Sequence, residues 1–168
     1  MKMPEVEPLL AGMAATLREK IALLPKPPVM VGIHTGGVWV AQALHAALAL
    51  PQPLGLLDIS FYRDDFGGRG LRSRTQPSSL PFAVDEQIII LVDEAVMTGR
   101  TTRAALNELF DYGRPSMVLL ATLVDIPRRE LPIQVDVAGI RMDLPPGQRV
   151  KLAGPTPLTL KLIDQPSL

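Results

Sequence analysis

Two adjacent acidic residues, Asp93 and Glu94, directly follow the apolar run Ile88–Val92. Such a run predicts a buried strand of a parallel sheet, and in open parallel sheets ligands bind outside the carboxyl ends of the strands. We therefore expect Asp93 at the carboxyl end of a strand, where both acids can accept hydrogen bonds from the hydroxyl groups of a ligand. Taken alone, two acids in this position are more often solvated surface charges.

A second feature is the segment Thr98-Gly99-Arg100-Thr101, which leads into a helix expected over residues 101–112. Threonine hydroxyls, free amides and a helix N-terminus together form a site for anions, and Arg100 adds positive charge. One segment therefore combines a phosphate cradle with a pair of carboxylates. That combination suits a sugar phosphate, whose phosphate would lie in the cradle and whose hydroxyls would meet the acids.

Other chemistries are disfavoured by what the sequence lacks. It contains no G-x-x-x-x-G-K-[ST] motif of P-loop proteins and no G-x-G-x-x-G motif of dinucleotide-binding folds. It also has no cysteine, which excludes a thiol nucleophile, a disulfide framework and a cysteine zinc site. His34 and His45 stand eleven residues apart without a matching acid cluster, so we do not expect them to bind a metal.

The elements that must position these residues alternate between helices and strands. Helical spacing or short apolar runs predict helices over 5–24, 38–49 and 101–112, and strands over 29–33, 54–61, 87–92 and 117–124. This order predicts an α/β fold with a mostly parallel central sheet and helices on both of its faces. We expect residues 126–168 to form shorter strands and turns that finish the sheet. The length suits a single domain over residues 1–168.

A long basic loop is expected over residues 62–80, which contain Arg63, Arg69, Arg72 and Arg74 among glycines and serines. Loops of this length inside a compact domain are uncommon and often functional. A plain surface excursion has about equal weight from composition alone.

Charge and hydropathy limit the partners. Basic and acidic residues are equal at 17 each, whereas nonspecific nucleic-acid binding usually needs a basic excess. RNA binding is therefore disfavoured, although a local basic patch is compatible with a neutral total. No signal-peptide pattern and no membrane-spanning run is apparent, so we expect no membrane association and a cytoplasmic location.

The segment Ile89–Thr101 resembles the phosphoribosyl pyrophosphate (PRPP) signature of the type I phosphoribosyltransferases. A closer resemblance is to the pyrimidine operon attenuation regulators that double as uracil phosphoribosyltransferases (the PyrR family). It is carried in order by the blocks 32–38, 58–65, 99–105 with 111–115, 123–125 and 129–133.

The resemblance implies a type I phosphoribosyltransferase fold with a flexible loop and a small hood. It implies a reaction that joins uracil to PRPP and yields UMP and pyrophosphate, with Mg²⁺ held indirectly, through ribose or water, by Asp93 and Glu94. The implied catalytic residues are Asp93, Glu94 and Arg63. PRPP would be bound by Asp93, Glu94, Ala95, Val96, Met97, Thr98, Gly99, Arg100 and Thr101, and pyrophosphate by Thr35, Gly36 and Gly37. The base would lie near Met97, Val124, Asp125 and Arg129.

The chain departs from the family pattern at two acidic or basic positions. Glu94 stands where the family usually has a second aspartate, and Gly36 stands where it usually has an arginine. The first helix also lacks the basic stretch of RNA-binding members. The resemblance implies a homodimer or higher homo-oligomer. The alternative function is a nucleotide-sensing regulator that binds RNA or a protein, with little or no catalysis.

Overall fold

The computed structural model of the chain describes residues 1–60 and 78–165. Its centre is a five-stranded sheet with the order β2-β1-β3-β4-β5, in which every neighbouring pair is parallel. The strands are β1 (Val29–Ile33), β2 (Gly55–Leu57), β3 (Ile88–Val96), β4 (Met117–Asp125) and β5 (Val137–Arg141). The expected parallel α/β architecture is therefore confirmed.

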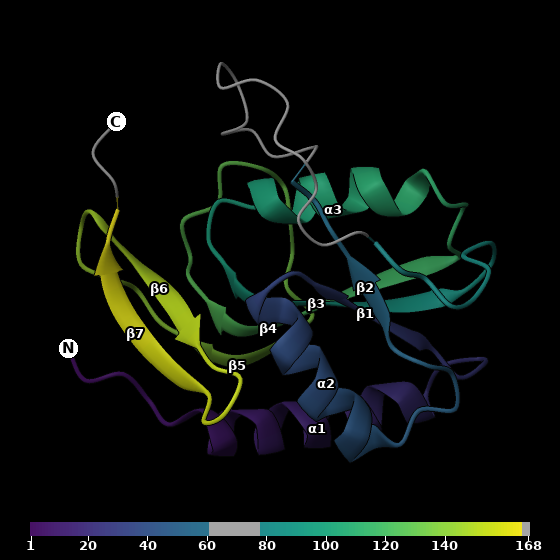
Figure 1. Cartoon of the computed structure of the whole chain (residues 1–168), viewed down its shortest axis with the longest axis horizontal. Helices are drawn as coiled ribbons and strands as arrows, with labels where there is room; N and C mark the ends of the chain where they lie inside the picture. Colours follow the sequence, from purple (N-terminus) through teal and green to yellow (C-terminus); the bar gives the residue numbers. More distant parts are fainter. Residues whose placement is uncertain (61–77, 166–168) are drawn as a thin grey trace.

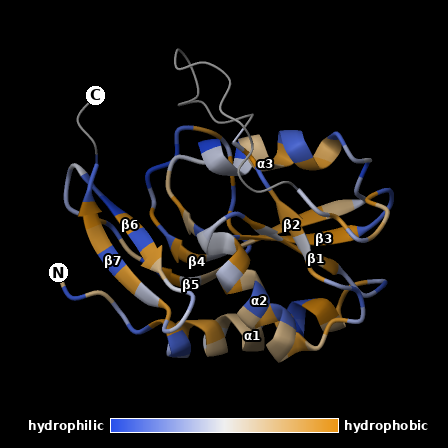
Figure 2. Cartoon of the chain, viewed as in Figure 1, coloured by the Kyte–Doolittle hydropathy of each residue, from blue (hydrophilic) through white to orange (hydrophobic). Residues whose placement is uncertain are grey.

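Helices cover both faces of this sheet (Figure 1). Helices α1 (Val6–Ala22) and α2 (Gly36–Leu48) pack on one face, and α3 (Arg100–Phe110) packs on the other. Successive side chains of a strand point to opposite faces, so Ile90 belongs to the core under α1 and α2 while Ile89 belongs to the core under α3. Burial on both faces explains why the central strands are apolar without alternation, as Figure 2 shows.

The connections after β1 and β3 place two helix N-termini at one edge of the sheet. Helix α2 begins at Gly36, shortly after β1 ends at Ile33, and α3 begins at Arg100, shortly after β3 ends at Val96. Strands β1 and β3 are adjacent and parallel, so both connections leave the same edge. The segments expected to bind pyrophosphate and phosphate are therefore neighbours in the fold.

The position of Asp93 at the end of a strand was predicted wrongly, because β3 continues to Val96 and Asp93 lies within it, 6% exposed. The ladder between β1 and β3 is formed up to Gly32 and Val92. On its other side β3 stays paired with β4, through Ala95 opposite Val124 and Val96 opposite Asp125. Asp93 and Glu94 thus lie beyond the end of the β1 ladder but inside the β3–β4 ladder.

Residues 126–168 were expected to finish the central sheet. Of the three strands described in this part of the chain, β5 joins that sheet, and the other two do not. Strands β6 (Gln148–Ala153) and β7 (Thr159–Asp164) pair antiparallel with each other in a separate two-stranded sheet. Val150 and Leu152 of β6 are buried in the core cluster that also includes α1 and α2, while Lys151 between them is exposed. This one-sided alternation gives the hairpin an apolar face, with which it docks as a hood beside the main sheet (Figure 1).

The remaining bounds differ modestly from expectation. Strand β2 is shorter than the predicted 54–61, and its Leu56 forms an antiparallel bridge with Ser79. In the described ranges, no helix has the length and apolar character that crossing a membrane requires.

Candidate active site

A pocket of about 110 Å³ lies where β3 passes into α3. Its lining comes entirely from this connection and the first turn of the helix: Val96, Met97, Thr98, Gly99, Thr101 and Thr102. Except for Thr102, these residues belong to the segment that the sequence predicted to bind PRPP. The structure therefore gathers the predicted cradle around one cavity.

Gly99 sets the shape of this connection. It adopts φ +92°, a left-handed conformation that side chains rarely tolerate, and a Cβ atom there would lie 2.8 Å from Cγ1 of Ile133. Thr98 stabilises the turn, since its Oγ1 accepts a hydrogen bond from the amide of Arg100 at 3.2 Å. The amide of Arg103 donates to Gly99 O, so the amides of Thr101 and Thr102 precede the first hydrogen bond of the helix. Amides in this position form an anion site.

Thr102 adds a feature that the sequence reasoning missed. It is 3% exposed, lines the pocket, and its Oγ1 makes no hydrogen bond within the described residues. A buried hydroxyl without a partner is costly, and a phosphate oxygen in the pocket would satisfy it. The available signal in the sequence was a second threonine directly after Thr101, in the first turn of the expected helix.

Arg100 is directed differently from the pocket-lining residues. It is exposed, and its Nε lies 3.3 Å from Oε2 of Glu130 in an ion pair whose two side chains are both about half exposed. Exposed pairs of this kind contribute little to stability. Arg100, which the sequence suggested for PRPP binding, is therefore paired with Glu130 and is not among the residues that line the cavity.

The loop expected to bind pyrophosphate packs directly against the two acids. A Cβ atom on Gly37 would lie 2.7 Å from Val92 O and 3.3 Å from Oδ1 of Asp93. A Cβ atom on Gly36 would lie 1.9 Å from Oε2 of Glu94. Thr35, the N-cap residue of α2, is exposed beside them. The structure thus brings the predicted pyrophosphate loop and the predicted ribose-binding acids together, and glycine is required where they meet.

The two acids have different surroundings. Asp93 is buried, and its Oδ1 accepts the amide hydrogen of Glu94 at 2.8 Å. Glu94 extends toward the hood, where its Oε2 accepts the amide hydrogen of Leu152 in β6 at 3.2 Å. The two acids were expected to act together on a ribose, but their carboxyl groups contact different parts of the structure: Asp93 the main chain of β3, and Glu94 the main chain of β6.

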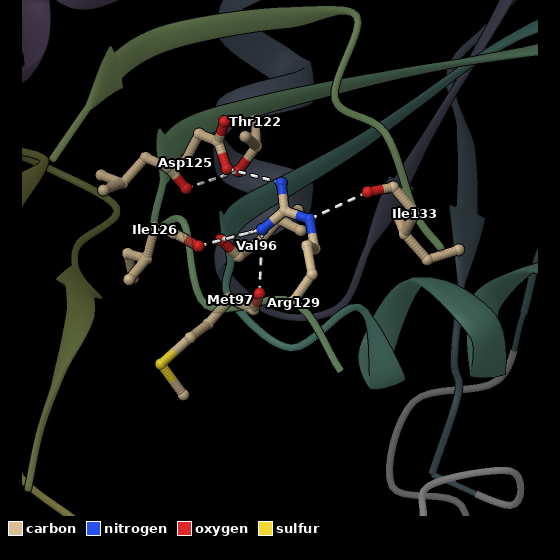
Figure 3. Close-up of polar contacts among 8 residues, drawn as sticks. Val96, Met97, Thr122, Asp125, Ile126, Arg129 and Ile133 are labelled. Carbon is tan, nitrogen blue, oxygen red and sulfur yellow. Dashed lines mark hydrogen bonds and ion pairs between the residues drawn. The ribbon is translucent and has the colours of Figure 1, made fainter. Parts of the chain in front are cut away.

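The guanidinium of Arg129 donates its hydrogen bonds to other groups of the protein, near the ends of β3 and β4 (Figure 3). Its Nη2 lies 2.6 Å from Oδ1 of Asp125, and Nη1 donates to Met97 O at 2.8 Å. Further bonds run to the carbonyl oxygens of Val96, Ile126 and Ile133. These contacts join the ends of β3 and β4 and hold the main chain that lines the pocket.

The four residues expected near the base divide into two groups. Met97, Asp125 and Arg129 lie together at this junction. Val124 is fully buried in the core under α1 and α2, and its carbonyl oxygen accepts a hydrogen bond from Oγ1 of Thr122. The side chain of Val124 is thus part of the core, whereas Met97 is partly buried and also lines the pocket.

His34 stands at the end of β1, beside the same edge of the sheet. Burial lowers the pKa of its imidazole below the ordinary value of 6.5, and the charge of Asp58 partly offsets this effect. Arg63, Arg69, Arg72 and Arg74, which the sequence suggested for closing the site, lie outside the described residues.

Among the described residues, no cluster of three or more histidine, aspartate or glutamate side chains could hold a metal. Asp93 and Glu94 offer two neighbouring carboxylates, which is too few for a protein cage. Mg²⁺ keeps several waters and is commonly held through one or two carboxylates together with substrate phosphates. The donor set therefore fits Mg²⁺ that is bound mainly by a phosphorylated substrate.

Comparison with known proteins identifies the family. The model of the phosphoribosyl transferase domain matches residues 2–144. The chain is 54% identical over 162 residues to "Bifunctional protein PyrR" of Pseudomonas paraeruginosa, covering 96% of this chain and 95% of that protein. It is 50% identical over 165 residues to the protein of the same name from Pseudomonas savastanoi pv. phaseolicola, covering 98% and 97%.

Solved structures agree with the fold. A purine phosphoribosyltransferase from Pyrococcus horikoshii is similar with a TM-score of 0.63 and 26% identity, over 82% of this chain and 83% of that one. A hypoxanthine-guanine phosphoribosyltransferase from Bacillus anthracis has a TM-score of 0.66 at 16% identity, over 84% and 83%. With this fold, this pocket and near full-length similarity to curated relatives, the chain belongs to the PyrR family of phosphoribosyltransferases.

Proposed function

We propose that the chain transfers the phosphoribosyl group of PRPP to uracil and releases UMP and pyrophosphate. One observation carries the proposal: a pocket at the N-terminus of α3 contains a buried Thr102 hydroxyl without a hydrogen-bond partner in the described residues. The amides of Thr101 and Thr102 precede the first helical hydrogen bond beside it. A 5′-phosphate supplies the acceptor oxygens that this arrangement lacks.

Asp93 is the group best placed to act on the ribose. It lies in β3, three residues before the first pocket-lining residue, Val96. Departure of pyrophosphate leaves positive charge on the ribose ring, and a buried carboxylate held in position stabilises that charge more strongly than water does. Asp93 keeps its orientation through the bond from the Glu94 amide, so the favourable geometry exists before the substrate binds.

Pyrophosphate would bind at Thr35, Gly36 and Gly37, where α2 begins. The start of this helix supplies amides directed at an anion, and it lies against Asp93 through the close approach of Gly37. Mg²⁺ bound to PRPP would neutralise charge on the pyrophosphate oxygens. Asp93 would meet it through ribose hydroxyls or water.

The base would lie over Met97, near the junction that Arg129 and Asp125 hold together. Arg129 already donates to Met97 O and to Asp125, so it acts on the base by fixing this wall. The preference for uracil rests on the resemblance to the PyrR family. The similar Pyrococcus horikoshii enzyme is named for purines, so the base preference needs a direct comparison.

The proposed activity is tested by incubating the protein with PRPP, Mg²⁺ and one radiolabelled base at a time: uracil, hypoxanthine or orotate. The expected result is UMP from uracil, with far slower product formation from the other two bases. Formation of a purine nucleotide at a higher rate would show that a purine base, and not uracil, is the preferred substrate. If no nucleotide forms although PRPP binds in calorimetry, the protein is a sensor of PRPP and not an enzyme.

A second role is favoured because the similar Pseudomonas proteins are named bifunctional. We propose that the chain also regulates a pyrimidine operon by binding nucleotide, and that its RNA affinity at physiological salt is weak. The neutral net charge supports weak affinity because phosphate contacts must be summed over many basic residues. Filter retention of a pyrimidine-leader RNA across a salt series tests this affinity. Light scattering tests the expected homodimer or higher homo-oligomer.

A further inference from the structure

Glu94 occupies the space beside the first residue of α2. A Cβ atom built on Gly36 would lie 1.9 Å from Oε2 of Glu94 and 2.5 Å from its Cδ. Both distances are far shorter than van der Waals contact, so the carboxyl group takes the volume that a side chain at position 36 would need. Any residue other than glycine at this position must push the carboxyl group away.

The same carboxyl group reaches the hood. Its Oε2 accepts the amide hydrogen of Leu152 at 3.2 Å, and Leu152 is 2% exposed. In an antiparallel ribbon, a strand directs its amides alternately toward its partner and toward its free edge. The amide of Leu152 points away from β7 and toward β3, so Glu94 satisfies a buried donor on the inner edge of the hairpin.

We propose that Glu94 is a positioning residue that links the hood to the pyrophosphate loop, and that position 36 is glycine to make room for it. The carboxyl group joins three elements that are distant in sequence: β3, the start of α2 and β6. It fixes the N-terminus of α2 and the hairpin relative to Asp93 from the adjacent position in β3. Glu94 therefore shapes the site through other groups, while Asp93 acts on the ribose.

The proposal explains the two departures from the family pattern as one unit. A glutamate at position 94 reaches Leu152 only where position 36 leaves space, and a bulkier residue at 36 would block that reach. The expected change in the KM for PRPP rests on the proposed function, because it assumes that PRPP binds at this loop. The contacts of Glu94 with Gly36 and Leu152 do not depend on that function, because they exist in the protein without substrate.

The test is a double-mutant cycle with Gly36→Ala, Glu94→Ala and the combination of both. Hydrogen exchange at the Leu152 amide and the KM for PRPP are measured for each protein. Both single variants are expected to speed exchange at Leu152 by about fivefold to tenfold, through loss of one hydrogen bond. The KM for PRPP should rise by a similar factor, with kcat changed by less than about twofold. The double variant should match Glu94→Ala alone, because the methyl group added at position 36 no longer meets a carboxyl group.

Two further variants separate positioning from charge and from general effects. Glu94→Gln keeps an oxygen that can accept the Leu152 amide hydrogen, so slow exchange and low KM should return. Gly12→Ala in α1, where a Cβ atom would meet nothing within 4 Å, is the matched glycine control and should change neither quantity.

Additive effects in the cycle would overturn the proposal, and so would unchanged Leu152 exchange in Glu94→Ala. A large loss of kcat in Glu94→Gln with slow Leu152 exchange would also overturn it, because the charge would then act directly in the reaction. If no nucleotide is formed by any protein but the exchange pattern holds, the proposed function fails while the positioning role stands.

Discussion

The guanidinium of Arg129 lies 2.6 Å from the carboxylate of Asp125, four residues earlier, and both groups are largely withdrawn from solvent. The same guanidinium donates to the carbonyl oxygens of four residues: Val96, Met97, Ile126 and Ile133. Asp125 is the last residue of β4, so this pair ties the end of one strand to the loop that follows its neighbour. The pocket wall at Met97 depends on it.

Arg129→Lys is expected to weaken both folding and PRPP binding. A lysine retains the charge but cannot supply the planar set of donors that reaches Asp125 and four carbonyl oxygens at once. The free energy of unfolding should fall by about 2–3 kcal/mol, and PRPP should bind about tenfold more weakly. Urea unfolding and calorimetry measure the two effects. Arg114→Lys, in an exposed ion pair with Glu86, is the control and should change neither. If the two variants have the same free energy of unfolding and the same PRPP affinity, Arg129 does not hold the pocket wall at Met97.

Thr102→Val should strengthen the fold while weakening phosphate binding. The Thr102 hydroxyl is buried without a hydrogen-bond partner in the described residues, so an apolar isostere removes an unfavourable group. The free energy of unfolding should rise by about 0.5–1 kcal/mol, and PRPP affinity should fall by about tenfold.

Thr102→Ser, which retains the hydroxyl, should bind PRPP about as well as the unchanged protein. Denaturant unfolding and calorimetry are measured on the same samples. A variant with valine that binds PRPP normally would show that the Thr102 hydroxyl does not face the phosphate.

Asp93→Asn should abolish transfer while leaving the fold intact. An asparagine oxygen can still accept the amide hydrogen of Glu94, so thermal unfolding should change by no more than about 2 °C. Without the negative charge, the positive charge that develops on the ribose is not stabilised, and kcat should fall by at least about 100-fold. Steady-state UMP formation provides the measurement. A variant that retains most of its kcat would exclude Asp93 from the ribose-binding role.

Stability should fall as the pH falls, because of His34. Burial lowers the pKa of this group in the folded protein, while the unfolded chain has the ordinary value of 6.5. As the pH decreases below that value, the unfolded state binds a proton that the folded state still excludes. The stabilisation is complete above pH 6.5 and is lost progressively down to the lowered folded pKa.

In the His34→Asn variant this part of the pH dependence should disappear. Urea unfolding at pH values from about 5 to 7.5 measures the slope, and the imidazole resonance of His34 gives its pKa directly by NMR. A His34 pKa at or above 6.5 would contradict the expected direction.

Several features of the site could be predicted from local sequence because short-range rules control them. The apolar run Ile88–Val92 predicted a buried strand of the parallel sheet, and Gly99 with its threonines marked the start of a helix. The end of β3 could not be predicted in this way. Its last residues remain in the sheet because β4 pairs with them, and pairing between strands depends on a partner more than twenty residues away in sequence.

The parallel α/β arrangement, the start of α3 and the family could be predicted from the amino-acid sequence, because strand burial and helix starts are encoded by neighbouring residues. The contacts of Glu94, Arg129 and Thr102 depend on the tertiary structure. Glu94 reaches a hairpin 58 residues away, and Arg129 contacts main chain more than thirty residues away. The Thr102 hydroxyl lacks a hydrogen-bond partner among the described residues because of how its surroundings pack. Such contacts arise when the chain folds onto itself, so no local pattern records them.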